Sequence, residues 1–437
     1  MRSDEYPRIR FADLLSEPLR NGVYKSKEYH GRGAKVVNMG ELFGYPRLRD
    51  VPMKRVELTD AEVRKSSLRR GDLLFARRSL VAEGAGRCSV VKEVGELTTF
   101  ESSIIRARLD CQKADSDFVY YYFASPQGRE LMRTILRQVA VSGIAGSDLA
   151  ELTIPVPPIA VQRQCARTLE QIDDRIDLLR QTNATIESIA QALFKSWFVD
   201  FDPVRAKAEG REPEGMDAET AALFPSEFEE SELGKIPKGW RVGCLGDILI
   251  QRVERAKPSI LTAGLPYVPI ECISPKSVFL CESLPGEQAQ SSLTFFKKDD
   301  VLFGAMRPYF HKVCIAPFDG VTRTTVFVLQ AKKGHMAFAL FAAFDDSTVE
   351  FATTHSEGST IPYAKWTSSL ERKRTIIPPA TIAAQFESLV TPLLESGMHN
   401  TTRSSLLTDL RDTLLPRLIS GKLRITEAME QVEEALT

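Results

Sequence analysis

Hydrophobic residues between positions 169 and 197 recur at alternating intervals of three and four. Such intervals mark the a/d seam of a coiled coil, and a polar residue on that seam, here Asn183, is the kind that fixes register. The pattern predicts a helix over 160–199, about 60 Å long at roughly 1.5 Å per residue. The seam consists of Leu169, Ile172, Ile176, Leu179, Asn183, Ile186, Ala190, Leu193 and Trp197.

A second seam with the same intervals lies near the other end of the chain. It is apolar at both ends and small or polar in the middle, and it consists of Val390, Leu393, Gly397, Asn400, Ser404, Leu407, Arg411, Leu414 and Leu418. Two such helices can bury their seams against each other, antiparallel within one chain, or against a further subunit. Two independent domains that each end in a helix are the simpler alternative.

The two helical patterns belong to a long internal duplication. The proline-rich stretch 154–158 recurs at 376–379, and a fixed offset of 221 residues carries Leu193 to Leu414. Gln162 and Gln385 correspond only after a slip of two residues. Upstream, residues 70–75 match residues 298–303. A duplication that spans whole domains implies pseudo-two-fold symmetry and suits a partner with two similar halves.

The globular parts alternate short apolar runs with Gly and Pro, so we expect an α+β fold. In the first part the strands are expected at 34–39, 72–76, 88–91 and 104–109, with a helix near 118–139. In the second they are expected at 267–273, 301–303, 313–316 and 325–330, with a short helix at 335–344. The acidic stretch 203–235, with several Pro and Gly, is expected to be a linker with local helix at 218–223.

These patterns divide the chain into two globular recognition domains in tandem, each followed by a long helix. The expected boundaries are 1–152 for the first domain, 153–202 for its helix, 203–235 for the linker, 236–374 for the second domain, 375–424 for its helix and 425–437 for an acidic tail that forms a frayed helix. The two helices are expected to pair as an antiparallel coiled coil.

The net charge of −1 conceals a strong local bias. Residues 1–110 hold 22 Lys and Arg against 16 Asp and Glu, whereas residues 205–235 hold 4 against 9. Local fields rather than the total steer a phosphate backbone. The densest basic cluster consists of Arg64, Lys65, Arg69, Arg70, Arg77, Arg78 and Arg87. It is a candidate nucleic-acid surface, and a solvated face is the alternative.

The sequence contains few of the motifs that mark catalytic sites. The phosphate loop, the His-Glu-x-x-His zinc motif and the Gly-x-Ser-x-Gly elbow are absent, and the five histidines are isolated. Glu371 and Lys373 have the spacing of some metal-dependent nucleases, although chance gives such a match in a chain this charged. The seven cysteines are dispersed without any Cys-x-x-Cys pair, so we expect free thiols rather than a metal site or disulfides.

What remains is a set of binding residues on loops. The segment 307–312 places basic and aromatic side chains between two expected strands, where Arg and Lys contact phosphates and a bidentate Arg can read guanine. An exposed hairpin is the alternative. Polar loops at 141–147 and 320–325 could touch a DNA backbone. The candidate DNA-binding residues are Arg69, Arg70, Arg77, Arg78, Arg87, Ser142, Arg307, Tyr309, His311, Lys312 and Arg323.

This arrangement resembles the specificity subunit (S subunit) of type I restriction–modification systems. The resemblance covers nearly the full chain, and its closest stretches are 196–203, 234–240, 245–247, 296–317 and 414–423. It implies that each globular unit is a target recognition domain that binds half of a bipartite site in double-stranded DNA, and that the helices form the spacer. It further implies a chain that catalyses nothing.

The resemblance also implies a set of partners. Modification subunits, two of them, would methylate adenine from S-adenosylmethionine, and restriction subunits would use ATP and Mg²⁺, so this chain would hold no cofactor. The chain has neither an apolar run of 18 residues nor an apolar N-terminal segment, so we expect a cytoplasmic location. Rival functions are a subunit of a methyltransferase system without a restriction partner, a stand-alone nuclease and a coiled-coil scaffold.

Overall fold

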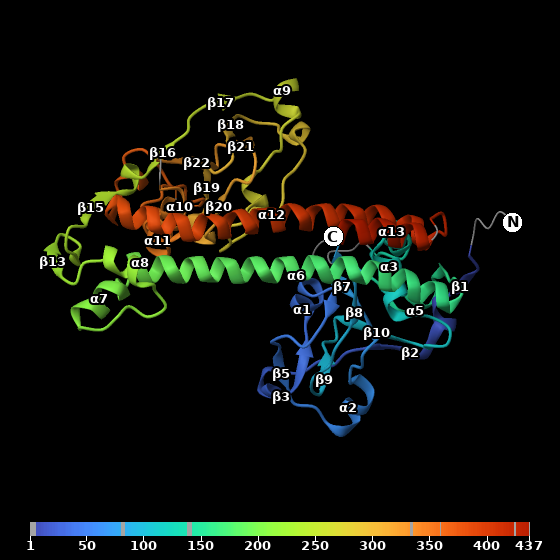
Figure 1. Cartoon of the computed structure of the whole chain (residues 1–437). Coiled ribbons are helices and arrows are strands. Elements are labelled where there is room, and N and C mark those ends of the chain that lie inside the picture. The colour runs from blue at the N-terminus through green and yellow to red at the C-terminus, as the bar shows by residue number, and fades with distance from the viewer. Residues whose placement is uncertain are drawn as a thin grey trace. The chain divides into compact units, whose positions relative to one another are not determined.

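The computed structural model describes residues 6–79, 84–137, 142–332, 335–358, 360–423 and 425–436. The chain forms two compact units: unit 1 is Met1–Ile176 with Leu407–Thr437, and unit 2 is Asp177–Leu406. Two helices of 40 residues, α6 (Ile159–Phe198) and α12 (Ala380–Ile419), each contribute to both units (Figure 1). None of the helices described is long and apolar enough to cross a membrane.

Helix α6 confirms the prediction made from its heptad pattern. It follows Pro157 and Pro158, which cannot donate backbone hydrogen bonds and therefore precede or open helices rather than interrupt them. It ends before Phe201, whose left-handed backbone (φ 57°) turns the chain into α7 (Asp202–Ala208). The predicted seam is apolar and buried along most of the helix, with the one polar position at Asn183.

The main sheet of unit 1 has five strands in the order β2 (Leu15–Asn21), β10 (Ile104–Leu109), β6 (Leu73–Ala76), β8 (Cys88–Val91) and β4 (Arg47–Leu48). Its first four strands pair antiparallel. A second sheet combines β5 (Lys54–Val56), β3 (His30–Val37) and β9 (Thr98–Phe100), and β1 (Arg8–Arg10) pairs with β12 (Thr153–Pro155). Phe11, Phe75 and Phe123 meet edge to face at the centre of the core.

The main sheet of unit 2 repeats this order with β16 (Leu249–Gln251), β22 (Val326–Ala331), β19 (Val301–Gly304) and β20 (Val313–Ile315). A second sheet combines β17 (Arg255–Ala256), β18 (Leu293–Phe296) and β21 (Gly320–Arg323), and β15 (Arg241–Cys244) pairs with β23 (Arg374–Ile377). Strand β6 therefore corresponds to β19, and β10 to β22. The internal duplication read from the sequence is a duplication of the sheet.

Each main sheet is followed by a pair of short helices. In unit 1 they are α3 (Ser116–Ala124) and α4 (Pro126–Arg133), and in unit 2 they are α10 (Met336–Phe344) and α11 (Asp346–Thr354). A single helix over 118–139 was expected in unit 1, and that prediction is wrong. Ser125 ends α3 in an extended conformation, and its hydroxyl caps α4, which opens at Pro126. Residues 138 and 139 lie outside the described residues.

A residue near the start of each long helix binds the helix pair of its own unit, but the residue differs between the units. The Gln162 side chain accepts a hydrogen bond from the Asp115 amide at the start of α3 (2.8 Å). Gln385, its match in the sequence, instead donates to Thr220 Oγ1 in α8 (Ala218–Leu223). In unit 2 the carboxylate of Glu387 accepts the Ala337 and Phe338 amides at the start of α10.

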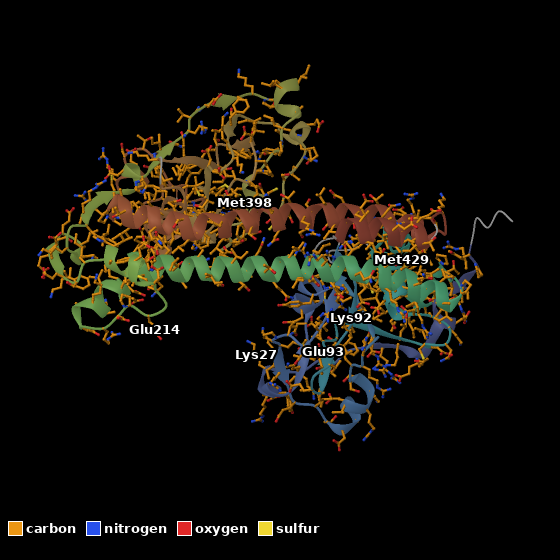
Figure 2. The ribbon with its side chains drawn as sticks, viewed as in Figure 1. Lys27, Lys92, Glu93, Glu214, Met398 and Met429 are labelled. Carbon is orange, nitrogen blue, oxygen red and sulfur yellow. The ribbon has the colours of Figure 1, made fainter. Side chains whose placement is uncertain are left out.

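Three further expectations are corrected. Residues 267–273 form no continuous strand, because Pro269 leads into the 3-10 turn Ile270–Cys272. The stretch 203–235 contains α7, the predicted helix α8 and a hairpin of β13 (Phe228–Ser231) with β14 (Gly234–Pro237). The tail folds as α13 (Ile425–Leu436) and buries Ala428 and Val432. In unit 1, Gln164 of α6 contacts the sulfur of Met429 on α13. Met429 is labelled in Figure 2.

The remaining described elements are short. Unit 1 also holds α1 (Met39–Gly44), α2 (Asp60–Ser66), α5 (Gly146–Glu151) and the strand pair β7 (Arg78–Ser79) with β11 (Ser142–Gly143). Unit 2 also holds α9 (Ile260–Ala263). All seven cysteines are free thiols; Cys165, Cys272 and Cys314 are buried, whereas Cys111 and Cys281 are exposed.

Candidate nucleic-acid interface

A buried aspartate anchors the turn before the central strand in both units. Asp72 accepts the Arg69 amide at 2.8 Å and the guanidinium of Arg108 at 2.7 and 2.8 Å. In unit 2, Asp300 accepts the Lys297 amide at 2.8 Å and the guanidinium of Arg252 at 2.9 and 3.2 Å. The hydrogen bonds to these aspartates raise the pKa of both arginines. The buried ion pair holds the residue that precedes β6 and the residue that precedes β19 in the same way.

The basic cluster predicted from the sequence divides between the two ends of β6. Arg69 and Arg70 are exposed at its amino end, whereas Arg77 and Arg78 follow its carboxyl end. Four residues of strand separate the two groups by about 13 Å. Arg87 belongs with the second group because its carbonyl accepts the Ala76 amide at 2.9 Å. Its guanidinium lies over the ring of Phe43.

Ser142 joins the group at the carboxyl end of β6. Strand β11 pairs with β7, which places Ser142 opposite Ser79 and Gly143 opposite Arg78. The Ile144 amide donates to the Arg77 carbonyl at 3.0 Å. The structure therefore brings together Arg77, Arg78 and Ser142, which are far apart in the sequence. Residue 141 of the predicted polar loop lies outside the described residues.

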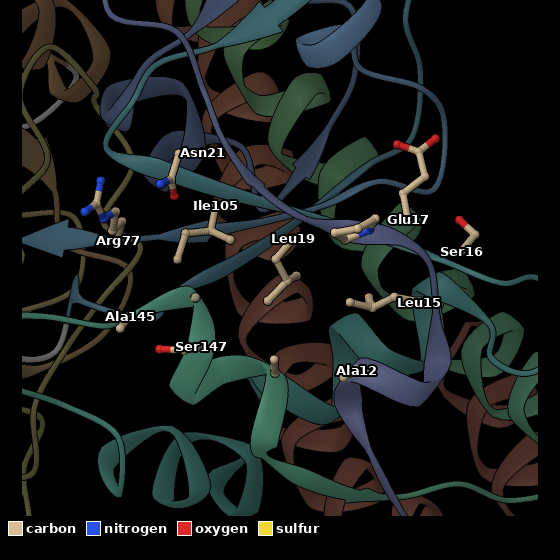
Figure 3. Close-up of a pocket in the computed structure, with 13 residues that line it drawn as sticks. Ala12, Leu15, Ser16, Glu17, Leu19, Asn21, Arg77, Ile105, Ala145 and Ser147 are labelled. Carbon is tan, nitrogen blue, oxygen red and sulfur yellow. The ribbon is translucent and has the colours of Figure 1, made fainter.

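A cleft of about 690 Å³ opens beside this group. Its apolar side chains include Leu15, Leu19 and Ile105, and Arg77 and Asn21 stand together at one end (Figure 3). Asn21 was missed in the sequence, because no strand was expected at 15–21 and a lone asparagine carries no signal by itself. Only the pairing of Asn21 opposite Ile105 in the sheet brings it near Arg77.

The segment 307–312 lies between β19 and β20, as expected, but only part of it faces solvent. Tyr309 and Phe310 are about half exposed, and Arg307 is partly buried. His311 is buried, with a ring nitrogen 2.7 Å from the Phe344 carbonyl, and burial lowers its pKa. The ammonium of Lys312 donates to the Ile270 carbonyl at 2.8 Å. His311 and Lys312 are therefore tied inside unit 2 instead of reaching outward.

Arg307 and Arg323, unlike His311 and Lys312, keep hydrogen-bond donors that have no partner among the described residues. Arg307 has a left-handed backbone (φ 52°), and its amide donates to the Pro362 carbonyl at 2.8 Å. Arg323 lies at the end of β21, and burial raises the pKa of Tyr267, while the positive charge of Arg323 lowers it by less. The buried Nε atoms of Arg307 and Arg323 have no hydrogen-bond partner among the described residues. Both side chains keep unused donors.

Within unit 2 the two long helices meet at a pair of asparagines. Asn400 Nδ2 donates to Asn183 Oδ1 at 3.0 Å, and Asn183 Nδ2 donates to the Gly397 carbonyl at 2.9 Å. Phe194 and Trp197, near the end of α6, contact Phe386, near the start of α12. The helices are therefore antiparallel in unit 2. Leu179, Ile186 and Leu193 of α6 and Leu393 of α12 also pack here.

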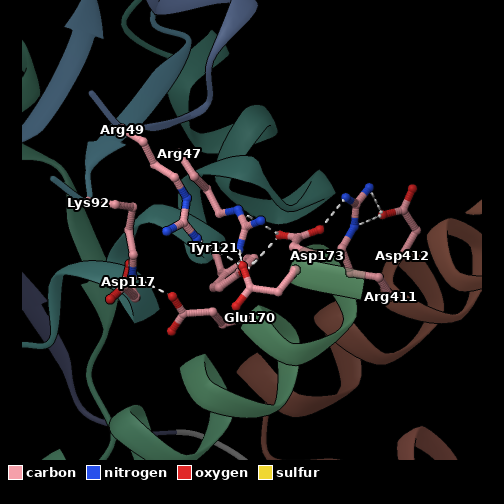
Figure 4. A network of polar contacts seen from close by, with 10 residues as sticks. Arg47, Arg49, Lys92, Asp117, Tyr121, Glu170, Asp173, Arg411 and Asp412 are labelled. Atoms are coloured by element: carbon pink, nitrogen blue, oxygen red, sulfur yellow. Dashed lines mark hydrogen bonds and ion pairs between the residues drawn. The ribbon is translucent and has the colours of Figure 1, made fainter. Parts of the chain in front are cut away.

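Within unit 1 the helices meet at a buried ion pair. Asp173 of α6 binds Arg411 of α12 at 2.8 Å and accepts the Tyr121 hydroxyl of α3 at 2.7 Å (Figure 4). Arg47 of β4 lies 3.9 Å from the same carboxylate. Burial alone would lower the pKa of Arg411, but Asp173 raises it overall. Apolar seam residues of this part are Leu169, Ile172, Ile176, Leu407 and Leu414.

The residues suggested for a nuclease do not form a catalytic pair. Lys373 donates to Ser347 Oγ, and burial lowers its pKa. The carboxylate of Glu371 accepts the Ser368 amide. In the described part of the chain, no three His, Cys, Asp or Glu side chains are grouped in a way that could hold a metal ion. This arrangement gives the nuclease alternative no support.

Residues 24–188 match the family model of the type I restriction modification DNA specificity domain. The type I restriction enzyme MjaIX specificity subunit of Methanocaldococcus jannaschii is 28% identical over 424 residues, which cover 92% of this chain and 90% of that protein. The HindI specificity subunit of Haemophilus influenzae is 24% identical, covering 82% of this chain and 88% of that protein.

A crystal structure shows the same fold. The S subunit of a type I restriction–modification system from M. genitalium matches with a TM-score of 0.58 at 14% identity, over 96% of this chain and 97% of that one. Residues 24–188 are therefore similar to the type I restriction–modification DNA specificity domain, and over nearly its whole length the chain is similar to the specificity subunits of type I restriction enzymes.

Proposed function

We propose that this chain is the DNA sequence-specificity subunit of a type I restriction–modification complex. Each unit binds one half-site of a bipartite target in double-stranded DNA, and the paired helices α6 and α12 set the gap between the half-sites. The chain itself catalyses no reaction. Methylation and cleavage belong to modification subunits, two per complex, and to restriction subunits. S-adenosylmethionine, ATP and Mg²⁺ are bound by those partners.

The observation that carries this proposal is that arginine follows the carboxyl end of the equivalent strand in both units. In unit 1, Arg77 and Arg78 follow the carboxyl end of β6, and in unit 2 Arg307 follows the carboxyl end of the equivalent strand β19. Guanidinium groups held at a fixed backbone can contact phosphates or read base edges. Two copies of one sheet, each with arginine beyond the carboxyl end of the equivalent strand, suit a target with two half-sites.

The proposal is tested by co-expressing the chain with the adjacent modification gene and mapping methylated adenines across the host genome by long-read sequencing. We expect a bipartite motif with a fixed gap of unspecified bases. An undivided motif from an assembled and active complex would contradict it. Adding the neighbouring restriction gene and measuring ATP-dependent cleavage of unmethylated DNA separates a restriction system from a methyltransferase system without such a partner.

A further inference from the structure

The cleft beside Arg77 has a counterpart at the same place in unit 2. A smaller hollow of about 170 Å³ is lined there by Val253, Thr324, Phe327 and Tyr363, among others. Backbone contacts establish the correspondence. Phe75 of β6 pairs with Ile105, and Phe303 of β19, its equivalent, pairs with Phe327. Ile105 and Phe327 are thus equivalent, and each lines the hollow of its unit.

The position of Arg77 is equivalent to that of Ala305. The Arg77 amide donates to the Ser103 carbonyl at 2.8 Å, and its carbonyl accepts the Ile144 amide at 3.0 Å. The Ala305 amide donates to the Thr325 carbonyl at 2.9 Å, and its carbonyl accepts the Ala364 amide at 2.8 Å. The same two backbone bonds fix both residues. A guanidinium side chain in unit 1 is therefore replaced by a methyl group in unit 2.

The position of Asn21 is equivalent to that of Val253. Asn21 pairs with Ile105, and Val253 continues the register of β16, in which Gln251 pairs with Leu329, to a place opposite Phe327. Val253 is largely exposed, and Asn21 is also exposed. The duplication has kept the backbone position of these residues in the sheet. It has exchanged the hydrogen-bonding side chains of Arg77 and Asn21 for the apolar side chains of Ala305 and Val253.

Neither the guanidinium of Arg77 nor the amide of Asn21 has a hydrogen-bond partner among the residues that the structure describes. Their backbones, by contrast, are fixed by the sheet, and both side chains stand at the same end of the cleft (Figure 3). Donors and acceptors that are free and positioned on a rigid strand are what base readout needs, since Arg pairs with guanine and Asn with adenine.

Resting on the proposed function, we propose that these two equivalent hollows are the base-reading sites of the two half-sites. Arg77 and Asn21 read base edges by hydrogen bonds in one half-site, at guanine or adenine. Val253 and Tyr363 read the other half-site by apolar contact, at a thymine methyl group. The exposed arginines Arg69 and Arg70, at the opposite end of β6, contact phosphates and read no base.

The test compares methylation maps of complexes that contain single variants. With Arg77→Ala or Asn21→Ala, we expect the preference at one or two bases of one half-site to relax by roughly 5- to 150-fold, while the other half-site and the gap stay unchanged. With Val253→Asn, only the other half-site should change. Arg20→Ala, on the opposite face of the strand from Asn21, and Ile250→Ala are the matched controls, and their motifs should equal that of the wild type.

Binding of the complex to duplex oligonucleotides, measured over a range of salt concentrations, completes the test. Arg70→Ala should weaken binding to all DNA sequences alike, and it should reduce the number of ions released on binding by about one. If Arg77→Ala behaves like Arg70→Ala, with an unchanged motif, the inference is overturned while the proposed function stands. A wild-type complex without a bipartite motif would overturn the proposed function itself. Arg77→Lys, which keeps the charge but not the bidentate geometry, should still relax the motif.

Discussion

Asn183 and Asn400 bind each other through their side-chain amides, at 3.0 Å, where α6 and α12 cross in unit 2. The seam around Asn183 is otherwise apolar, the seam around Asn400 is small or polar, and Asn183 Oδ1 accepts the hydrogen bond of the Asn400 amide. We expect Asn183→Leu to lower the free energy of unfolding by about 1–3 kcal/mol, because the Asn400 amide loses its acceptor.

The double variant Asn183→Leu with Asn400→Leu separates pairing from simple destabilisation. It removes both polar groups and should recover much of the stability that either single variant loses. Urea denaturation of the four proteins gives the coupling energy. Strictly additive losses would show that the two amides act independently.

The buried Asp173 carboxylate should be needed for the stability of unit 1. Asp173→Asn leaves Arg411 and Arg47 without their shared counter-charge, which typically costs about 3 kcal/mol for a buried pair. The neighbouring Asp174 is the matched control. It is half exposed and pairs with Arg47 and Arg49, so Asp174→Asn should cost at most about 1 kcal/mol. Equal losses in thermal unfolding would contradict the distinction.

The free energy of unfolding should depend on pH through the buried carboxyl group of Glu187. Burial raises the pKa of Glu187, although its carboxylate accepts the Val278 amide and the Ser277 hydroxyl. As pH rises above the ordinary value of 4.5, the unfolded chain releases this proton before the folded chain does. The unfolded state then binds fewer protons, so this group lowers the free energy of unfolding as pH rises through that interval.

Glu187→Gln removes this pH-dependent contribution to the free energy of unfolding and keeps an oxygen that accepts the Val278 amide. Between pH 4.5 and neutrality, its free energy of unfolding should therefore rise relative to that of the wild type. Denaturant titrations of both proteins at several pH values measure the difference. Two parallel curves would show that Glu187 does not titrate differently in the folded chain.

The segment 307–312 of unit 2 should affect the recognition of one half-site only. Arg307 has an unused buried donor and follows the carboxyl end of β19, so Arg307→Ala should alter recognition at a single half-site in the methylation map. Lys298→Ala, at the amino end of the same strand, is the control and should leave the motif unchanged. Equal loss at both half-sites for Arg307→Ala would show that the loop acts on assembly instead.

Local patterns in the sequence predict the long helices and the duplication well. The heptad of α6 is set by residues three and four apart, so it is visible without tertiary contacts. The burial of His311 could not be predicted in this way, because Phe344 and Ile270, which surround its loop, come from other parts of the chain. Similarly, the sequence predicts the strand at 72–76 between Arg70 and Arg77, but it does not reveal that Ser142 lies beside Arg78, because β11 and β7 are far apart in the chain.

The last prediction concerns the paired helices. Seven residues inserted into α6 and seven into the facing part of α12 preserve the heptad seam and lengthen each helix by about 10 Å. Because one base pair rises about 3.4 Å, the gap between the half-sites should grow by about three base pairs while both half-sites keep their sequence. The same seven residues placed after Gly210, which is exposed between α7 and α8, should leave the gap unchanged. An unchanged gap in the helix variant would show that the helices do not set the spacing.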